Sequence, residues 1–486
     1  MGKRAGHDEH HHDRRRPPSL PLLSAIEGID WPPILDPQAA RLLAYLQYLD
    51  RSQWLPGEAL RDRQRQQLRR VVQHAVDTVP WYQERLAAAA VRGDEEVSPE
   101  RWRAIPLLSR ADVQDAGDAL RSRALPRSHG EVARLMTSGA TAEPVVVLST
   151  DVTRFLWSAC TIRDHLWHGR DFDRSLAVIR YARRGVAEPP DGKSFADWRA
   201  PTHGITSTGP CHLLSIDSTV DEQAAWLRRV QPNYLLSYAT VLRSLCEHFS
   251  RNGGAPTSLR EVCSFGEIVE PDLRHHVERV FGVPLVDMYS AQEVGYIALQ
   301  CPESTAYHVQ AENVLVEVLD DDGHPCQPGE VGRVVVTTLH NFASPLLRYD
   351  IGDFAEVGDA CTCGRGLPVL RRVLGRQRNM LTLRDGRRRW PSFALGGRPE
   401  QLPPFRKVQL LQRSLEEIEV RVVRDTPLEP AEMVLAEAYL NQSLGQAFRY
   451  VFRVVDDIPR SGSGKFEDFV SAIDAAAAAT APPCAT

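Results

Sequence analysis

The sequence contains no run of 18 or more apolar residues, so it predicts no membrane-spanning helix. Its first twenty residues are charged and rich in histidine, and they lack the apolar stretch of a secretory signal. The net charge is only −5, and although arginine greatly outnumbers lysine, the basic residues are dispersed among acidic ones. We therefore expect a cytoplasmic protein that binds neither a membrane nor a nucleic acid.

The cysteine content does not indicate a disulfide framework. The chain has nine cysteines, an odd number, and no export signal is expected. In such a chain cysteines are predicted to be mostly reduced thiols, and some of them could bind a metal ion.

The length of 486 residues predicts two or three domains. Residues 1–20 read as a disordered arm, and residues 37–86 carry apolar stripes at helical spacing. From 151 to 300, helices alternate with short apolar strands, which is typical of an α/β fold. After Arg376 the composition changes, and a compact α+β unit of about 100 residues is expected.

Four segments, 175–182, 234–239, 261–267 and 284–290, are strand-like, and each is followed by a loop or a helix start. Ligands bind beyond the carboxyl ends of parallel strands, so we expect these ends to share one crevice. The residues expected there are Ser237, Tyr238, Ser264, Phe265, Gly266, Glu267, Tyr289 and Ser290.

Glu293 follows the last of these strands and has two interpretations. Its carboxylate could hold Mg²⁺ in the crevice. It could equally be an acidic residue in the first turn of a helix, where it would favour the macrodipole.

The stretch LMTSGATAEP at 135–144 is a candidate phosphate loop. Small hydroxyl and glycine residues allow the backbone to approach phosphate oxygens closely. The candidate residues are Thr137, Ser138, Gly139 and Thr141. An ordinary hairpin turn is the alternative interpretation.

Three cysteines and one histidine form a candidate metal site. Cys301 and His308 are spaced C-x6-H, and Cys361 and Cys363 form a C-x-C pair about fifty residues later. A Cys3His set suits tetrahedral Zn²⁺ and leaves no open position, so the site would be structural. The alternative is that the four residues are unrelated and that His308 is a core or ribose-side histidine.

Six short motifs occur in order along the chain. They are TSGATAEP (137–144), SFGE (264–267), MYSAQEVG (288–295), LLRYDIGD (346–353), LGR (374–376) and RSGSGK (460–465). This order resembles the core motifs of adenylate-forming enzymes, the superfamily of acyl-CoA synthetases, peptide-synthetase adenylation domains and luciferases. It resembles the phenylacetate–CoA ligase branch in particular, over nearly the whole chain after about residue 40.

The resemblance implies ATP-dependent activation of a carboxylic acid, with an aromatic acid as the expected substrate. The acid would become an acyl-adenylate with release of pyrophosphate, and coenzyme A would then capture the acyl group. An amine or a carrier-protein thiol is the alternative acceptor. Because Ala142 and Glu143 depart from the usual phosphate loop, a catalytically degenerate nucleotide-binding protein is a further alternative.

The resemblance also implies roles for single residues. Lys465 would be the catalytic cation, Glu293 would bind Mg²⁺, and Asp353 would accept the ribose hydroxyls. Arg376 would support the ribose or phosphate side. Gly266, Glu267, Tyr289 and Ser290 would contact the nucleotide, and Tyr238, Ser264 and Phe265 would line the acyl pocket.

The implied fold is α/β, with a large multi-layer adenylating domain at 21–374 and a small α+β lid at 375–474. The lid would carry Lys465 and would rotate about Gly375 and Arg376 between the two half-reactions. Residues 475–486 would be a tail. The sequence leaves the oligomeric state open, with a homodimer as one option.

Overall fold

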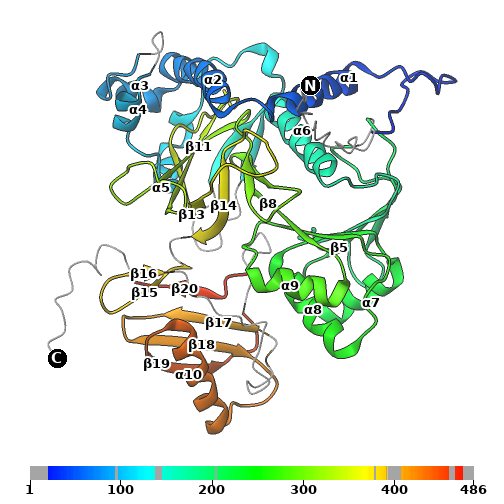
Figure 1. Ribbon diagram of the computed structural model, residues 1–486, viewed down its shortest axis with the longest axis vertical. Helices are drawn as coiled ribbons and strands as arrows, with labels where there is room; N and C mark the ends of the chain where they lie inside the picture. Colours follow the sequence, from blue (N-terminus) through cyan, green and yellow to red (C-terminus); the bar gives the residue numbers. More distant parts are fainter. Residues whose placement is uncertain are drawn as a thin grey trace, which may run out of the picture.

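The structure is a computed structural model that describes residues 20–92, 97–136, 145–202, 205–376, 379–389, 391, 405, 407–458 and 466–473. The expected arm, except Leu20, and the expected tail lie outside these residues. Figure 1 shows a large mixed unit above a smaller C-terminal unit. No helix within the described ranges is long and apolar enough to cross a membrane.

The N-terminal segment is helical, as its apolar stripes predict. The helices are α1 (Pro37–Ser52), α2 (Gly57–Thr78), α3 (Pro80–Ala88), α4 (Pro99–Ala104) and α5 (Arg110–Ala116). Ser109 and Asp112 form a reciprocal capping box at the start of α5, in which the hydroxyl of Ser109 accepts from the backbone N–H of Asp112.

A large mixed sheet organises the next part of the chain. Its parallel part consists of β3 (Leu176–Arg180), β5 (Cys211–Ser215), β6 (Tyr234–Ser237), β7 (Glu261–Phe265) and β8 (Leu285–Ala291). Its antiparallel part consists of β4 (Lys193–Phe195), β9 (Gly295–Gln300), β10 (Tyr307–Val309), β11 (Val314–Leu319), β12 (Val331–Thr338), β13 (Tyr349–Val357) and β14 (Val369–Arg376). Among the described residues the strand order is β11-β12-β13-β14-β10-β9-β8-β7-β6-β3-β5-β4. The α/β fold and the four predicted strand segments are therefore confirmed.

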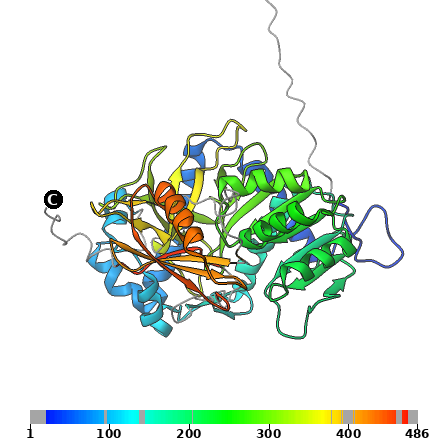
Figure 2. The same cartoon turned by 90° about the horizontal axis from the view of Figure 1, so that it is seen from below.

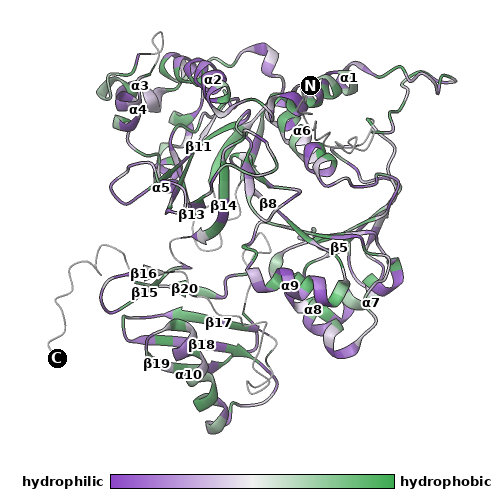
Figure 3. Cartoon of the chain, in the orientation of Figure 1, coloured by the Kyte–Doolittle hydropathy of each residue, from purple (hydrophilic) through white to green (hydrophobic). Residues whose placement is uncertain are grey.

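Helices cover the parallel part of this sheet. They are α7 (Val220–Val230), α8 (Ala239–Asn252) and α9 (Pro271–Phe281), while α6 (Asp151–Trp167) packs against β9. Figure 3 shows polar and apolar residues on α8 and α9, as expected for helices with one buried face. On α8, Leu242, Leu245 and Phe249 are buried in the core, and each such side chain contributes about 1.5–3 kcal/mol.

A short hairpin flanks the candidate phosphate loop. It pairs β1 (Ala133–Met136) with β2 (Val146–Ser149) in antiparallel register. The residues between them, 137–144, lie outside the described ranges.

The C-terminal unit has its own sheet and its own hydrophobic core. Its elements are β15 (Leu381–Thr382), β16 (Arg388–Arg389), β17 (Lys407–Gln412), β18 (Glu417–Val423), α10 (Pro430–Leu444), β19 (Arg449–Val454) and β20 (Phe469–Ser471). Its main sheet has the order β19-β18-β17-β20. Leu410, Ile418 and Phe469 belong to a core cluster that contains no residue of the large sheet. Seen from below in Figure 2, this unit is drawn in front of the large unit. Its separate sheet and core confirm a small C-terminal domain with a sheet.

Candidate active site and metal centre

Residues from three of the motifs meet at one end of the large sheet. The Tyr289 hydroxyl on β8 donates to Asp353 Oδ2 on β13 at 2.8 Å. Arg376 Nε at the end of β14 lies 3.6 Å from Asp353 Oδ1. The Tyr349 hydroxyl at the start of β13 donates to Glu293 Oε1 at 3.3 Å. Two carboxylates, one guanidinium and two phenols therefore form one polar cluster from distant parts of the chain.

The backbone explains why Asp353 and Arg376 are neighbours. They are directly paired residues in the antiparallel ladder between β13 and β14, so their side chains leave the sheet side by side. Just before Asp353, the Asp350 carboxylate accepts from the Gly352 backbone N–H at 2.9 Å. Gly352 has a φ of +81°, a value that glycine adopts without strain.

Glu293 lies in the turn between β8 and β9, so its interpretation as an acidic residue in the first turn of a helix is wrong. The two apolar runs around it pair as a hairpin instead of ending in a helix. The residue is only 8% exposed. Among the described residues no cationic side chain forms an ion pair with Glu293, and buried carboxylates normally have a cation or metal beside them. A magnesium ion fits this carboxylate, because Mg²⁺ is usually held by one or two carboxylates and substrate phosphates.

Tyr289 is largely buried, and burial together with the nearby Asp353 carboxylate raises its pKa well above the ordinary value. Its hydroxyl is therefore a proton donor at neutral pH. It orients Asp353, and its predicted contact with the nucleotide stays a prediction. Ser290, the next residue, is partly exposed.

The ends of β6 and β7 contribute the predicted pocket residues and part of the predicted nucleotide residues. The rings of Tyr238 and Phe265 pack together with centroids 4.5 Å apart. Ser264 is 0% exposed, and its hydroxyl donates to the buried Asp287, so in this structure it supports the strand and has no free surface. Gly266 has a φ of +73° and turns the chain so that Glu267 follows at the end of the strand.

Several predicted site residues lie outside the described residues. They are Thr137, Ser138, Gly139 and Thr141 of the phosphate loop, together with Lys465. Ala142 and Glu143, on which the degenerate alternative rests, lie outside as well. Their roles stay predictions.

The four predicted zinc ligands meet at one place. Cys301 follows β9, His308 is in β10, and Cys361 and Cys363 lie in the loop between β13 and β14. Their ligand atoms all lie within 4.8 Å of one another. Cys301 Sγ is 3.7 Å from Cys361 Sγ, and Cys363 Sγ is 3.3 Å from His308 Nε2. Tetrahedral zinc with ordinary bond lengths would give about 3.8 Å and about 3.5 Å, so the donor set fits this metal.

The protonation state of His308 also suits a ligand. Burial, and next the positive charge of Arg365, lower the pKa of His308 to about 4. The imidazole is therefore neutral near pH 7, as metal ligation requires.

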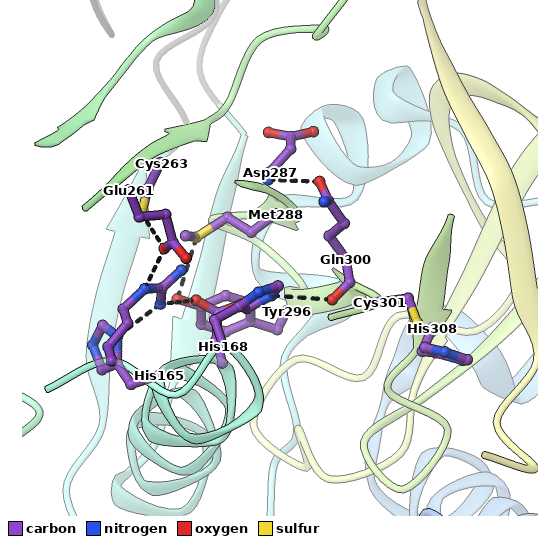
Figure 4. A network of polar contacts seen from close by, with 12 residues as sticks. His165, His168, Glu261, Cys263, Asp287, Met288, Tyr296, Gln300, Cys301 and His308 are labelled. Atoms are coloured by element: carbon purple, nitrogen blue, oxygen red, sulfur yellow. Dashed lines mark hydrogen bonds and ion pairs between the residues drawn. The ribbon is translucent and has the colours of Figure 1, made fainter. Parts of the chain in front are cut away.

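A buried polar network lies between this metal centre and the start of β7 (Figure 4). Arg170 is 2% exposed and bonds Asp164 at 2.5 Å and Glu261 at 2.6 Å. His168 Nε2 lies 3.2 Å from the Gln300 backbone oxygen, next to Cys301. The side chain of Gln300 in turn accepts from the backbone N–H of Asp287 at 2.9 Å. The network joins the end of α6 to β7, β8 and β9.

Sequence reasoning did not find this network. Its charged members lie at 164, 170 and 261, where isolated charges look like solvated surface residues. Glu261 at the start of an apolar strand was the one available signal, because an acid in a buried strand needs a buried partner.

Two family matches agree with this geometry. Residues 199–343 match the family described as AMP-binding enzyme, and residues 403–471 match the family described as CapK C-terminal domain. The first match spans β5 to β12, and the second spans most of the C-terminal unit.

Individual relatives point the same way. A phenylacetate-coenzyme A ligase from Thermus thermophilus is 28% identical over 396 residues, which cover 79% of this chain and 85% of that protein. A phenylacetate-coenzyme A ligase from Escherichia coli is 25% identical over 339 residues, covering 66% and 72%. The solved structure of a 2-hydroxyisobutyryl-CoA ligase in complex with 2-HIB-AMP matches with a TM-score of 0.67 at 17% identity, covering 87% of this chain and 91% of that one. The chain is therefore similar to the adenylate-forming enzymes, and to phenylacetate–coenzyme A ligases in particular.

Proposed function

We propose that this protein activates a carboxylic acid with ATP, releases pyrophosphate, and transfers the acyl group from the adenylate to coenzyme A. The observation that carries the proposal is the meeting of Tyr289, Glu293, Asp353 and Arg376 at the carboxyl end of the sheet. The relatives named phenylacetate-coenzyme A ligase favour an aromatic acid as the substrate.

Asp353 and Arg376 form the nucleotide end of the proposed site. Asp353 accepts hydrogen bonds from the ribose hydroxyls. The hydroxyl of Tyr289 holds this carboxylate in place with a hydrogen bond of 2.8 Å. Arg376 lies beside Asp353, so its guanidinium can bind either the ribose hydroxyls or the phosphate of the nucleotide. Gly266 and Ser290 belong to the same nucleotide site, and the ring pair Tyr238–Phe265 bounds the acyl side. The carboxylate of Glu267, which the sequence also assigns to the nucleotide, instead accepts from the backbone N–H groups of Thr240 and Phe466.

Glu293 is the proposed magnesium ligand. The ion, when bound, neutralises charge on the phosphate oxygens during transfer. Glu293 is suited to this role because it is buried and its described contact is the Tyr349 hydroxyl, which leaves carboxylate oxygen for a cation.

Lys465 is the proposed catalytic cation, together with the loop residues Thr137, Ser138, Gly139 and Thr141. A unit charge 4 Å from the transferring phosphate is worth about 4 kcal/mol at an effective dielectric constant of about 20. This corresponds to roughly a thousandfold in rate. The motif RSGSGK carries this assignment.

The proposed domain boundary lies at residues 374 and 375. The separate core of the C-terminal unit supports a lid at 375–474 that moves as one body. Gly375 has a φ of +89° and packs against Ile268, so the joint between the two units leaves no room for a side chain at this position. We assign residues 21–374 to the adenylating domain.

The Cys3His cluster is the proposed structural zinc site. Its ligands come from the segment after β9 and from the loop after β13, so one ion would join the two segments that carry Glu293 and Asp353.

The eight described cysteines form no disulfide, which suits a reducing compartment such as the cytoplasm.

The test is ATP–pyrophosphate exchange with a panel of aromatic and aliphatic carboxylic acids. We expect acid-dependent exchange, strongest with an aromatic acid, and acyl-CoA formation when coenzyme A is added. Product formed only with amines or a carrier protein would replace the proposed acceptor. No exchange with any acid, while ATP still binds, would identify a degenerate nucleotide-binding protein.

A further inference from the structure

The carboxylate of Glu267 joins two parts of the molecule that are far apart in sequence. Its Oε2 accepts from the backbone N–H of Thr240 at 2.9 Å. Its Oε1 accepts from the backbone N–H of Phe466 at 2.7 Å. Thr240 is in the first turn of α8, and Phe466, which belongs to the C-terminal unit, lies 199 residues after Glu267.

The contact with α8 holds the carboxylate in place. The residue before this helix, Tyr238, makes no side-chain capping hydrogen bond, so Glu267 supplies the acceptor that a cap would provide. A negative charge is also favourable at a helix N-terminus. One oxygen of Glu267 is therefore fixed to the large unit, and the other is presented to the C-terminal unit.

The contact with the C-terminal unit is next to the proposed catalytic residue. Phe466 directly follows Lys465 in the sequence, so a bond at the Phe466 N–H acts on the peptide unit that the two residues share. A hydrogen bond to a carboxylate is among the stronger ones in proteins. Glu267 thus restrains the start of the described segment 466–473, which directly follows Lys465 in the sequence.

We propose that Glu267 is a positioning residue that holds the C-terminal unit, through Phe466, in the arrangement used for the adenylation half-reaction. The inference rests on the proposed function and on the lid rotation it includes. When the lid turns away, the Phe466 N–H leaves Glu267, while the bond from Thr240 remains. Glu267 therefore matters for adenylation and not for transfer to coenzyme A.

The surrounding interface has other charged groups, and Glu267 is distinguished from them by its contact. Arg243 bonds Asp272 at 2.6 Å within the large unit. Glu270 and Asp468 approach each other across the interface as like charges. The bond at Phe466 links a large-unit carboxylate directly to the backbone of the C-terminal unit.

The experiment compares the full-length wild type with Glu267→Ala and Glu267→Gln. Adenylation is measured by ATP–pyrophosphate exchange, and transfer by acyl-CoA formation from a supplied acyl-adenylate. We expect Glu267→Ala to lower kcat for exchange by about 10- to 150-fold, the loss of one hydrogen bond to a charged group, with little change in the KM for ATP. Transfer should stay within about twofold. Glu267→Gln keeps one carbonyl acceptor and should recover part of the loss.

Hydrogen exchange at the Phe466 amide gives a readout that does not need activity. We expect protection in the wild type, faster exchange in Glu267→Ala, and no change in the control Glu278→Ala, which removes an exposed carboxylate from α9. Thermal melting of each variant checks folding.

Three results would overturn the inference. A raised KM for ATP with unchanged kcat would make Glu267 an adenine contact. Equal loss in both half-reactions would make its role structural. An unprotected Phe466 amide in the wild type would remove the contact. Failure of the proposed function looks different, because the wild type itself would then show no acid-dependent exchange.

Discussion

The hydroxyl of Tyr289 donates to Asp353, 64 residues later in the chain, at 2.8 Å. This bond crosses from β8 to β13 and joins two motifs that would otherwise be independent. It gives Asp353 one fixed orientation while leaving its Oδ1 facing Arg376.

Removing this hydroxyl tests the nucleotide end of the site. Tyr289→Phe keeps the buried ring but loses a hydrogen bond to a carboxylate, worth about 1.5–3 kcal/mol. We expect the KM for ATP to rise by about tenfold or more, with the KM for the acid little changed. Steady-state kinetics for both substrates give the comparison. Tyr296→Phe is the matched control, because that hydroxyl contacts Met288 and Thr161 away from Asp353; equal effects in both variants would contradict the assignment.

The Cys3His cluster predicts one zinc ion per chain. Cys363→Ser removes a ligand and should abolish zinc binding and lower the melting temperature, because the ion joins two separate loops. Metal analysis of the purified protein and thermal melting make the measurement. Cys326→Ser, in the β11–β12 turn, should leave both unchanged. The prediction would be contradicted if wild-type protein, purified without chelators, contained no zinc.

Docking of the C-terminal unit should weaken as pH rises. Burial, and next the charges of Asp468 and Asp272, raise the pKa of Glu270 to about 7, while Arg243 and Arg372 oppose the shift. Burial also raises the pKa of Asp468. Because the pKa of Glu270 is raised, its contribution is complete below its ordinary pKa and is lost as pH rises through about 7. A shift of this size corresponds to at most about 3.4 kcal/mol.

Hydrogen exchange of the interface between pH 5.5 and 8.5, corrected for the intrinsic rate, measures this effect. We expect less protection at the alkaline end, and Glu270→Gln should flatten the profile because glutamine stays neutral. A wild-type profile as flat as that of the variant would show that Glu270 does not titrate in this range.

Gly375→Ala should destabilise the joint between the units. The added Cβ would lie 2.1 Å from Ile268 Cδ1, and the φ of +89° is strained for any residue with a side chain. The strained backbone costs about 1–3 kcal/mol, and the clash adds to it. Chemical denaturation of Gly375→Ala, Ile268→Ala and the double variant separates the two terms. The double variant should be more stable than the sum of the single effects predicts, and strict additivity would argue against the clash.

The strand ends were predictable because apolar runs such as 261–267 and 284–290 are bounded in the sequence by loop and helix-start residues. The metal cluster was predictable because cysteine and histidine have few common roles at such spacing. The position of Glu293 in a hairpin was not, because a turn and a helix start look alike until β8 is seen to pair with β9. The Arg170 network and the Glu267–Phe466 contact depend on partners about 90 to 200 residues away, and local sequence patterns carry no information on them.

The central claim is that this chain forms an acyl-adenylate with Lys465 as the catalytic cation. The most direct measurement is acid-dependent ATP–pyrophosphate exchange in the wild type and in Lys465→Ala, beside acyl-CoA formation from a supplied acyl-adenylate. The account predicts exchange in the wild type, a loss of roughly a thousandfold in Lys465→Ala, and nearly normal transfer in both. A wild type that binds ATP but exchanges with no acid, or a variant that loses both half-reactions equally, would contradict it.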